Sequence, residues 1–179
     1  MQVYIFGFFL LLSACATQPD YRPNPTPPET VKNVDLSRYA GTWFEIARYP
    51  NSFEKNCQGV TAEYEQKADG SIRVLNTCRI GSPDGKIRTA EGRARVVEGT
   101  GNAKLRVKFA PAWVPFAEGD YWILHLEADY SAALVGDPSG RYLWILAREN
   151  TLTPETLLAI KTRAAELGYD PNKLEPVAH

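Results

Sequence analysis

The amino-acid sequence predicts an all-β protein: an eight-stranded antiparallel up-and-down barrel with a C-terminal α-helix packed on its outside. Three observations support this fold class. From residue 35 onward, turn signals rich in Gly, Pro, Asp and Asn recur at intervals of roughly ten to eighteen residues. Between them, apolar and polar residues alternate with a period of two, which is typical of strands with one buried and one solvated face. A single segment with helical periodicity follows the last predicted strand.

The N-terminal residues 1–14 are uncharged and contain an apolar stretch of about ten residues, half of what a membrane-spanning helix needs. This length fits the h-region of a signal peptide. The run Leu12-Ser13-Ala14-Cys15 resembles the lipobox of bacterial lipoproteins. That resemblance implies cleavage before Cys15, which then carries a diacylglyceryl thioether and an N-acyl group such as palmitate. Ala16 stands where lipoproteins of the inner membrane usually have Asp, which implies the outer membrane, most simply its periplasmic side.

A proline-rich segment follows the cysteine. Residues 16–34 hold five of the 13 prolines of the chain, so this segment favours extended polyproline II over helix or sheet. We therefore divide the chain into a lipoprotein signal peptide (1–14), a lipidated cysteine with a Pro-rich tether (15–34) and a barrel domain with its helix (35–179).

The barrel domain contains eight segments with strand character. They lie near residues 42–49, 60–66, 71–78, 87–97, 104–109, 121–127, 132–136 and 142–148. Their short connections predict a meander, and closing it into a barrel removes the exposed edges. The helix begins after the N-cap Thr153, with Pro154 in its first turn, and stops at Gly168. Its apolar stripe is expected to cover the later strands, which are apolar on both faces.

Two cysteines remain once Cys15 is consumed by lipid. Cys57 and Cys78 flank the predicted hairpin turn at residues 68–70 almost symmetrically, which places them roughly opposite each other on neighbouring strands. Export would put them in an oxidising compartment. We therefore predict a Cys57–Cys78 disulfide.

Three short motifs resemble the signatures of the lipocalin family. Gly41 and Trp43 match the Gly-x-Trp of its first strand, and Asp129-Tyr130 matches the second signature, in which the usual preceding Thr is Ala here. Arg148 matches the arginine that ends the last barrel strand. The chain most resembles the bacterial outer-membrane lipocalins, relatives of apolipoprotein D. This resemblance implies that all five residues are structural, with the arginine stacked on the tryptophan face.

An eight-stranded barrel can enclose one small ligand. On the sixth strand we favour Tyr121, Ile123 and His125 as inward-facing, although Trp122, Leu124 and Leu126 are equally apolar. Small residues at inward positions, such as Ala62 and Ala94, are expected to leave room. The predicted ligand-binding residues are Ala62, Tyr64, Val74, Ala94, Val107, Phe109, Tyr121, Ile123, His125, Trp144 and Leu146, with Phe53, Trp113 and Phe116 from loops at the mouth.

The predicted interior is apolar and elongated, which suits an acyl chain. The lipocalin resemblance implies fatty acids or lysophospholipids as ligands, storage or transport of lipid in membrane maintenance as the role, and allows a homodimer. No cofactor, metal ligand spacing or catalytic group is evident, because His125 has no neighbouring nucleophile in the sequence. We therefore predict a binding protein and no enzyme.

The sequence is also compatible with two other functions. One is an envelope-tethered interaction protein whose barrel is filled by its own side chains. The other is a binder of a cyclic chromophore such as haem, for which His125 and Tyr64 are the candidate axial ligands. Nucleic acid is excluded as a partner, because the formal net charge is only -1.

Overall fold

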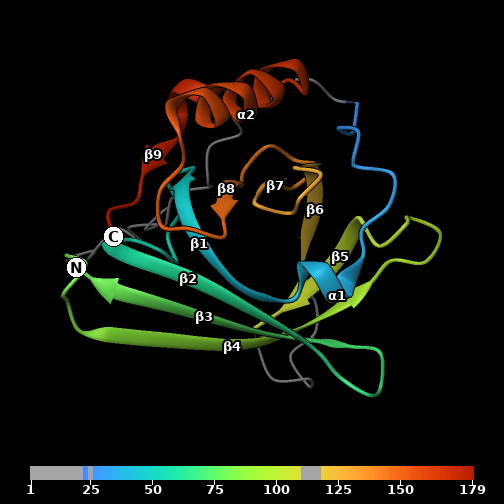
Figure 1. The fold of residues 1–179 in the computed structure, drawn as a ribbon, viewed down its shortest axis with the longest axis horizontal. Coiled ribbons are helices and arrows are strands. Elements are labelled where there is room, and N and C mark those ends of the chain that lie inside the picture. The colour runs from blue at the N-terminus through green and yellow to red at the C-terminus, as the bar shows by residue number, and fades with distance from the viewer. Residues whose placement is uncertain (1–21, 24–25, 110–117) are drawn as a thin grey trace, which may run out of the picture.

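The structure is a computed structural model that describes residues 22–23, 26–109 and 118–179. Its strands form one antiparallel sheet in the order β2-β3-β4-β5-β6-β7-β8-β1-β9, and an additional pairing of β1 with β2 closes it into a barrel. The helix α2 lies along one side of this barrel (Figure 1). The predicted fold class is therefore confirmed.

All eight predicted strands are present, and their ends differ from the prediction by no more than three residues. The strands are β1 (Gly41–Arg48), β2 (Cys57–Gln66), β3 (Ile72–Ile80), β4 (Ile87–Val96), β5 (Lys104–Lys108), β6 (Glu118–Leu126), β7 (Ala132–Gly136), β8 (Leu143–Ala147) and β9 (Glu175–Pro176). The helices are α1 (Leu36–Tyr39), α2 (Pro154–Glu166) and the 3-10 helix η1 (Pro171–Lys173). Sequence reasoning missed α1, η1 and β9, which are too short to show a period.

The barrel has two different ends, which we name by their loops. The closed end carries α1 and the loops 67–71, 97–103 and 127–131; the open end carries the loops 49–56, 81–86 and 137–142. Near the closed end β1 pairs with β2, from Gly41 to Phe44. Toward the open end β1 pairs instead with β9, at Ala47 and Arg48. The short strand β9 therefore fills the seam where β1 and β2 separate.

Buried apolar side chains form two main clusters on opposite faces of the barrel wall. The interior cluster contains Val34, Tyr39, Trp43, Tyr64, Ile72, Val74, Ala94, Ala103, Leu105, Ile123, Ala133, Val135 and Leu146. The outer cluster contains Ala47, Tyr49, Leu124, Ala132, Leu134, Leu143, Ile145, Ile160, Ala164, Leu167, Tyr169 and Leu174. The helix therefore covers the strands that are apolar on both faces, as predicted.

The ends of α2 follow the predicted signals. Thr153 is the N-cap and its hydroxyl accepts from the backbone N–H of Thr156, while Pro154 begins the helix. Gly168 follows the C-cap with a φ of +87°, a left-handed conformation that favours glycine. These local signals fix the length of the helix that covers β7 and β8.

The described part of the predicted tether lies against the barrel. Val31 packs on the interior cluster and Val34 belongs to it, and the Val34 N–H donates to the carbonyl of Gly101 at the closed end. Arg22 is buried and donates to the carbonyl of Leu167, beyond the end of α2. The folded part of the chain thus begins before residue 35. The predicted signal peptide (1–14), Cys15 and residues 16–21 lie outside the described residues.

Candidate ligand-binding site

The closed end is sealed by the residues of the first and third motifs. The indole N–H of Trp43 donates to the carbonyl of Tyr39 at 2.8 Å, and the Arg148 guanidinium lies 4.0 Å from the centre of the Trp43 ring. Arg148 also donates to the carbonyls of Arg38 and Ala40 at 2.7 and 3.0 Å. These carbonyls end α1, so one cation caps the short helix and covers the tryptophan.

The other motif residues have local structural tasks. Gly41 starts β1 with a φ of +92°, where a side chain would be strained. Tyr130, at a φ of +65°, accepts a hydrogen bond on its hydroxyl from the Asp35 N–H. The Asp129 carboxylate accepts from the side chain and backbone of Ser131, which lowers the pKa of Asp129. The five motif residues therefore lie at the closed end, away from the mouth.

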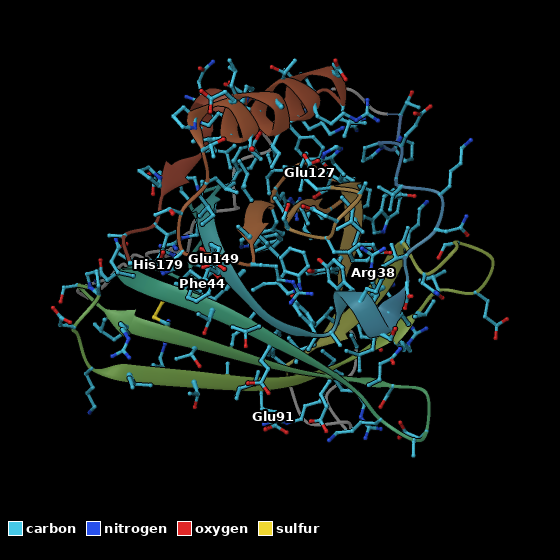
Figure 2. The ribbon with its side chains drawn as sticks, in the orientation of Figure 1. Arg38, Phe44, Glu91, Glu127, Glu149 and His179 are labelled. Carbon is cyan, nitrogen blue, oxygen red and sulfur yellow. A yellow bond between two sulfur atoms is a disulfide. The ribbon has the colours of Figure 1, made fainter. Side chains whose placement is uncertain are left out.

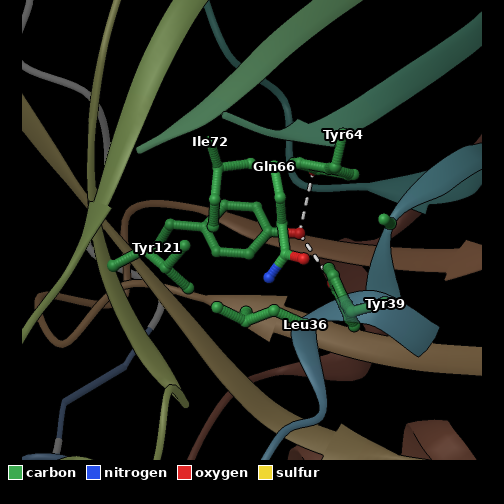
Figure 3. A pocket seen from close by; sticks show the side chains of 8 residues that line it. Leu36, Tyr39, Tyr64, Gln66, Ile72 and Tyr121 are labelled. Carbon is green, nitrogen blue, oxygen red and sulfur yellow. Dashed lines mark hydrogen bonds between the residues drawn. The ribbon is translucent and has the colours of Figure 1, made fainter. Parts of the chain in front are cut away.

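Three tyrosines form the floor of the barrel. The Tyr121 hydroxyl lies 2.7 Å from that of Tyr39 and 2.9 Å from that of Tyr64, as the dashed lines in Figure 3 show. Burial raises the pKa of all three phenols, so they are neutral at physiological pH. Beside them, with Gln66 and Leu36 in its lining, is a cavity of only about 10 Å³, the space of one water molecule.

The lower interior is packed solid. Val74, Ala94, Ile123 and Leu146 all face inward as predicted, but each is almost completely buried in the interior cluster. Ala94 is 1% exposed, so its small side chain fits tightly among its neighbours and leaves no space. These residues close the lower barrel and do not border an open cavity.

The upper interior is more open. The predicted residues Ala62, Val107 and Trp144 pack on the interior cluster but are only partly buried. On β4, Ala90 occupies an inward-facing position but is exposed to solvent. Its cross-strand partner on β3, Asn76, is half-buried. Exposure of an inward-facing strand position means that the barrel is hollow there. The space available to a ligand therefore lies toward the open end.

Gly92 and Phe109 meet in this upper part. A side chain at Gly92 would collide with the Phe109 ring, because an added Cβ would lie 2.7 Å from it. Phe109 itself is 45% exposed. The space that Gly92 leaves is thus taken by an aromatic ring that also borders the hollow.

The prediction that His125 faces the interior is wrong. A register shift between Ile123 and His125 places His125 opposite Leu134, which belongs to the outer cluster. The next residue, Leu126, then packs on the interior cluster. His125 is half-buried, with its Nε2 3.1 Å from Glu127. The bulge thus removes the histidine from the barrel and, with it, one of the two candidate haem ligands.

The predicted disulfide is confirmed. Cys57 and Cys78 are bonded, with their Cα atoms 5.3 Å apart, and the sulfur atoms lie near the open ends of β2 and β3 (Figure 2). They are not directly opposite, since Cys57 pairs with Ile80 after a register shift in β2. The bond ties the start of β2, and with it the loop 49–56, to the wall of the mouth.

Aromatic side chains gather on one side of the mouth. Phe53 is 52% exposed, and its ring lies 5.5 Å from Tyr142 and 6.5 Å from Trp144. This confirms the placement of Phe53 in a mouth loop. Trp113 and Phe116 lie outside the described residues.

A buried charge cluster inside the barrel was not predicted. Arg48 donates to Glu45 at 2.7 Å, and Glu54 accepts from the indole N–H of Trp144 at 3.2 Å. Burial, followed by the nearby charge of Glu54, raises the pKa of Glu45 well above its usual range. Alternation from Trp43 places Glu45 inward, and this signal could have identified the cluster.

Among the described residues, no group of three or more His, Cys, Asp or Glu side chains is arranged to hold a metal ion. In the same part of the chain, no helix is both long and apolar enough to cross a membrane.

Comparison with known proteins agrees with this architecture. The family model of the lipocalin-like domain matches residues 34–179. The chain is 41% identical over 151 residues to temperature-induced lipocalin-1 of Arabidopsis thaliana, covering 82% of this chain and 80% of the relative. It is 40% identical over 158 residues to the outer membrane lipoprotein Blc of Citrobacter freundii, covering 84% of each.

Among solved structures, the chain superposes on insecticyanin from the tobacco hornworm Manduca sexta with a TM-score of 0.68. That match covers 90% of this chain and 87% of insecticyanin at 23% identity, so it supports the fold alone. Proteins of the lipocalin family typically bind small hydrophobic molecules. Motifs, barrel and family match agree, and the chain belongs to the lipocalin family.

Proposed function

We propose that this lipocalin binds a single-chain lipid, a fatty acid or a lysophospholipid, in the upper half of its barrel. The observation that carries the proposal is the change along the barrel axis from a solid lower core to a hollow upper part whose inward positions, such as Ala90, are exposed. Half-buried Val107 and Trp144 give this hollow an apolar wall. A flexible acyl chain fits such a space better than a rigid ring does.

The free energy expected for binding an acyl chain suits a lipid carrier. Burying 12–16 methylenes at about 0.8 kcal/mol each gives a gross gain of about 10–13 kcal/mol. Association costs of about 4 kcal/mol or more leave at most about 6–9 kcal/mol, which corresponds to dissociation constants from about 40 μM down to about 0.3 μM. This affinity permits both uptake and release, as storage or transport of lipid in membrane maintenance requires.

We also propose that Cys15 anchors the protein to the outer membrane. The uncharged N-terminal stretch and the lipobox-like sequence support this, as does the likeness to a relative named as an outer membrane lipoprotein. Arg22 donates to the carbonyl of Leu167, just beyond the end of α2. The nearby Tyr169 hydroxyl donates to the carbonyl of Asp137 in an open-end loop. An anchor seven residues before Arg22 would thus keep Arg22 itself, on the side of the barrel that carries this loop, within about 25 Å of the bilayer.

The ligand proposal is tested by native mass spectrometry of the purified protein. We expect bound masses that correspond to single-chain lipids carried through purification, and their replacement when palmitate or a lysophospholipid is added. A bare protein that also takes up neither lipid would support a barrel filled by its own side chains and refute lipid binding.

The anchor is tested by the substitution Cys15→Ala in the full chain. We expect the variant to be recovered unprocessed or in the soluble fraction, since two or more acyl chains are what holds a protein stably on a bilayer. Cys57 and Cys78 are unchanged in this variant, so folding serves as the internal control. Membrane attachment as strong as that of the wild type would refute the anchor.

A further inference from the structure

Large apolar side chains are exposed mainly at the open end of the barrel. Among the described residues five such side chains are exposed, and three of them lie at this end: Phe53, Ile80 and Ile87, with exposed fractions of 52%, 38% and 53%. The other two are Phe109, which borders the hollow, and Leu158 on α2. The closed-end loops, all of which are described, expose none. Single exposed apolar residues are ordinary, but a cluster at one end indicates a contact surface.

Hydrogen bonds and ring contacts join the open-end loops into one surface. The Gly81 N–H donates to the carbonyl of Asn56 at 2.7 Å, and Arg88 Nη2 donates to the carbonyl of Phe53 at 2.8 Å. The Phe53 ring lies 5.5 Å from the ring of Tyr142. In Figure 1 the end of β3 and the start of β4 lie on the side opposite α1. We call this surface the rim, which consists of the loops 49–56, 81–86 and 137–142 with Ile80, Ile87 and Arg88.

The rim carries an excess of exposed positive charge. Two of its carboxylates are turned into the protein: half-buried Glu54 accepts from the indole of Trp144, and buried Asp137 accepts from the Tyr142 N–H. The remaining charges are four exposed cations and one exposed anion, although the whole chain has a formal net charge of only -1. The positive charge is therefore local to this end. The cations are Lys55, Lys86, Arg88 and Arg141, and the anion is Asp84.

Apolar side chains interleaved with cations suit the surface of an anionic bilayer. Apolar side chains enter the boundary between headgroups and acyl chains, while Lys and Arg keep their charged ends at the level of the phosphates. Each basic residue near an anionic lipid surface raises the affinity about fivefold. The rim has both components, whereas attraction by the net charge of the whole chain would be absent.

The N-terminal side of the described chain leads to the same end. The Arg22 guanidinium lies 5.6 Å from the centre of the Tyr169 ring. The Tyr169 hydroxyl donates to the carbonyl of Asp137, which belongs to the rim. A membrane anchor that precedes Arg22 therefore joins the domain on the side that carries the rim.

We propose that the rim binds the surface of an anionic phospholipid bilayer, so that the mouth of the barrel rests on the leaflet. Phe53, Ile80 and Ile87 enter the headgroup boundary, and Lys55 and Lys86 contact lipid phosphates. This contact needs neither a lipid in the barrel nor an acyl chain on Cys15, so it goes beyond the proposed function. For a protein that also carries lipid, it lets an acyl chain pass between leaflet and barrel without crossing bulk water.

The test measures how far vesicles protect lysines of the full chain from a water-soluble amine-labelling reagent, by mass spectrometry. With vesicles of phosphatidylethanolamine and phosphatidylglycerol in equal parts, we expect Lys55 and Lys86 to be labelled at least about tenfold more slowly than in buffer, or 1.4 kcal/mol. Lys67 and Lys32, which lie at the closed end, should keep their rates. Phosphatidylcholine vesicles or added salt should give weaker protection, because the cations then contribute less.

Matched variants test the apolar part of the rim. Phe53→Ser and Ile87→Ser should each weaken the protection of Lys86 about tenfold, because each removes a large apolar side chain from the contact. Leu158→Ser is the control, since Leu158 is 66% exposed but lies on α2, outside the rim. It should leave the protection unchanged. Ile87 lies on the outer face of β4, so Ile87→Ser should also keep the affinity of the wild type for palmitate.

A second pair of variants tests the charge. Lys55→Gln should weaken the protection of Lys86 about fivefold. Lys67→Gln changes the net charge by the same amount at the closed end and should have no effect. Thermal unfolding checks that every variant is folded, which is expected because all of these side chains are exposed.

The outcomes separate the rim from the anchor and from lipid binding. Equal labelling rates of rim and closed-end lysines on anionic vesicles refute the rim, even for a protein attached through Cys15. Loss of the protection in Cys15→Ala at saturating vesicle concentration also refutes it, because the contact is independent of the anchor. Protection without vesicles that rises with protein concentration would assign the rim to a second copy of the chain and refute the bilayer. A protected protein that binds no palmitate or lysophospholipid supports the rim and refutes the proposed function alone.

Discussion

Arg48 joins the interior of the barrel to the loop at its mouth. Besides its pair with Glu45, its Nη2 donates to the carbonyls of Glu54 at 3.2 Å and Cys57 at 2.8 Å. The loop 49–56 is therefore held by a buried cation on one side and the disulfide on the other. A buried ion pair is costly to desolvate, so this pair adds little net stability. Its main effect is to fix the position of the loop 49–56 at the mouth.

Glu45 should give the protein a measurable pH dependence. Burial raises its pKa in the folded state above the value of about 4.3 in the unfolded chain. The folded state then binds this proton more tightly, so the stabilisation is complete below pH 4.3 and is lost as pH rises through the folded pKa. We expect the free energy of unfolding of the wild type to fall, relative to Glu45→Gln, between pH 5 and 8, as measured by urea denaturation.

The control for this measurement is Glu91→Gln. The Glu91 carboxylate is exposed on the outer face of β4, as Figure 2 shows, and its hydrogen bond with Arg73 lowers its pKa. Its contribution is therefore lost only as pH falls below about 4.3, so the same difference should be flat from pH 5 to 8. A flat difference for Glu45→Gln as well would contradict the assigned direction.

At the level of the elements, α2 explains why β7 and β8 lack an alternating pattern. All five residues of β7 are buried, since one face points into the barrel and the other lies under the helix. Ile160 and Ala164 supply the buried stripe of α2. The helix thus completes the core of the strands that it covers.

Two substitutions on this helix separate packing from helix propensity. Ile160 is completely buried and Leu158 is 66% exposed. We expect Ile160→Ala to lower the free energy of unfolding by about 2–5 kcal/mol, because it leaves a cavity in the outer cluster. Leu158→Ala should stay within about 0.5 kcal/mol of the wild type. Equal effects of the two in denaturant titrations would mean that α2 does not pack as described.

The elements were the most predictable level of this structure. Alternation located strands such as β2, β4 and β5, turn signals bounded the strands that are apolar on both faces, and the signals at Thr153, Pro154 and Gly168 located the helix. All of these patterns depend only on near neighbours. The bulge that turns His125 outward is different, since both faces of β6 are apolar and alternation alone cannot reveal a one-residue insertion. The strand β9 escaped for a different reason: its two residues are too few to show a period, and they are defined only by the gap that they fill.

Across the whole molecule, the depth of an inward-facing residue along the barrel axis decides whether it can contact a ligand. Sequence patterns do not encode this depth. Ala62, Ala90 and Ala94 are all small and lie at inward-facing positions, so alternation alone cannot distinguish them. In the structure Ala94 lies in the packed lower core, while Ala90 faces the open upper part. Inward-facing residues were thus predictable from alternation, but the part of the barrel that stays hollow depends on how all eight strands close.

This difference gives a direct test of where the ligand lies. Ala90→Trp should fill the upper hollow and weaken fatty-acid binding at least tenfold, or 1.4 kcal/mol, while the protein keeps its stability, since the new ring enters solvent-accessible space. Ala94→Trp should instead overpack the lower core and destabilise the fold by about 1–3 kcal/mol or more. Thr89→Trp, on the outer face of β4, is the control and should change neither property. Binding is followed by competition with a fluorescent fatty acid, and stability by urea denaturation. A folded Ala90→Trp variant with unchanged affinity would place the ligand outside the upper barrel.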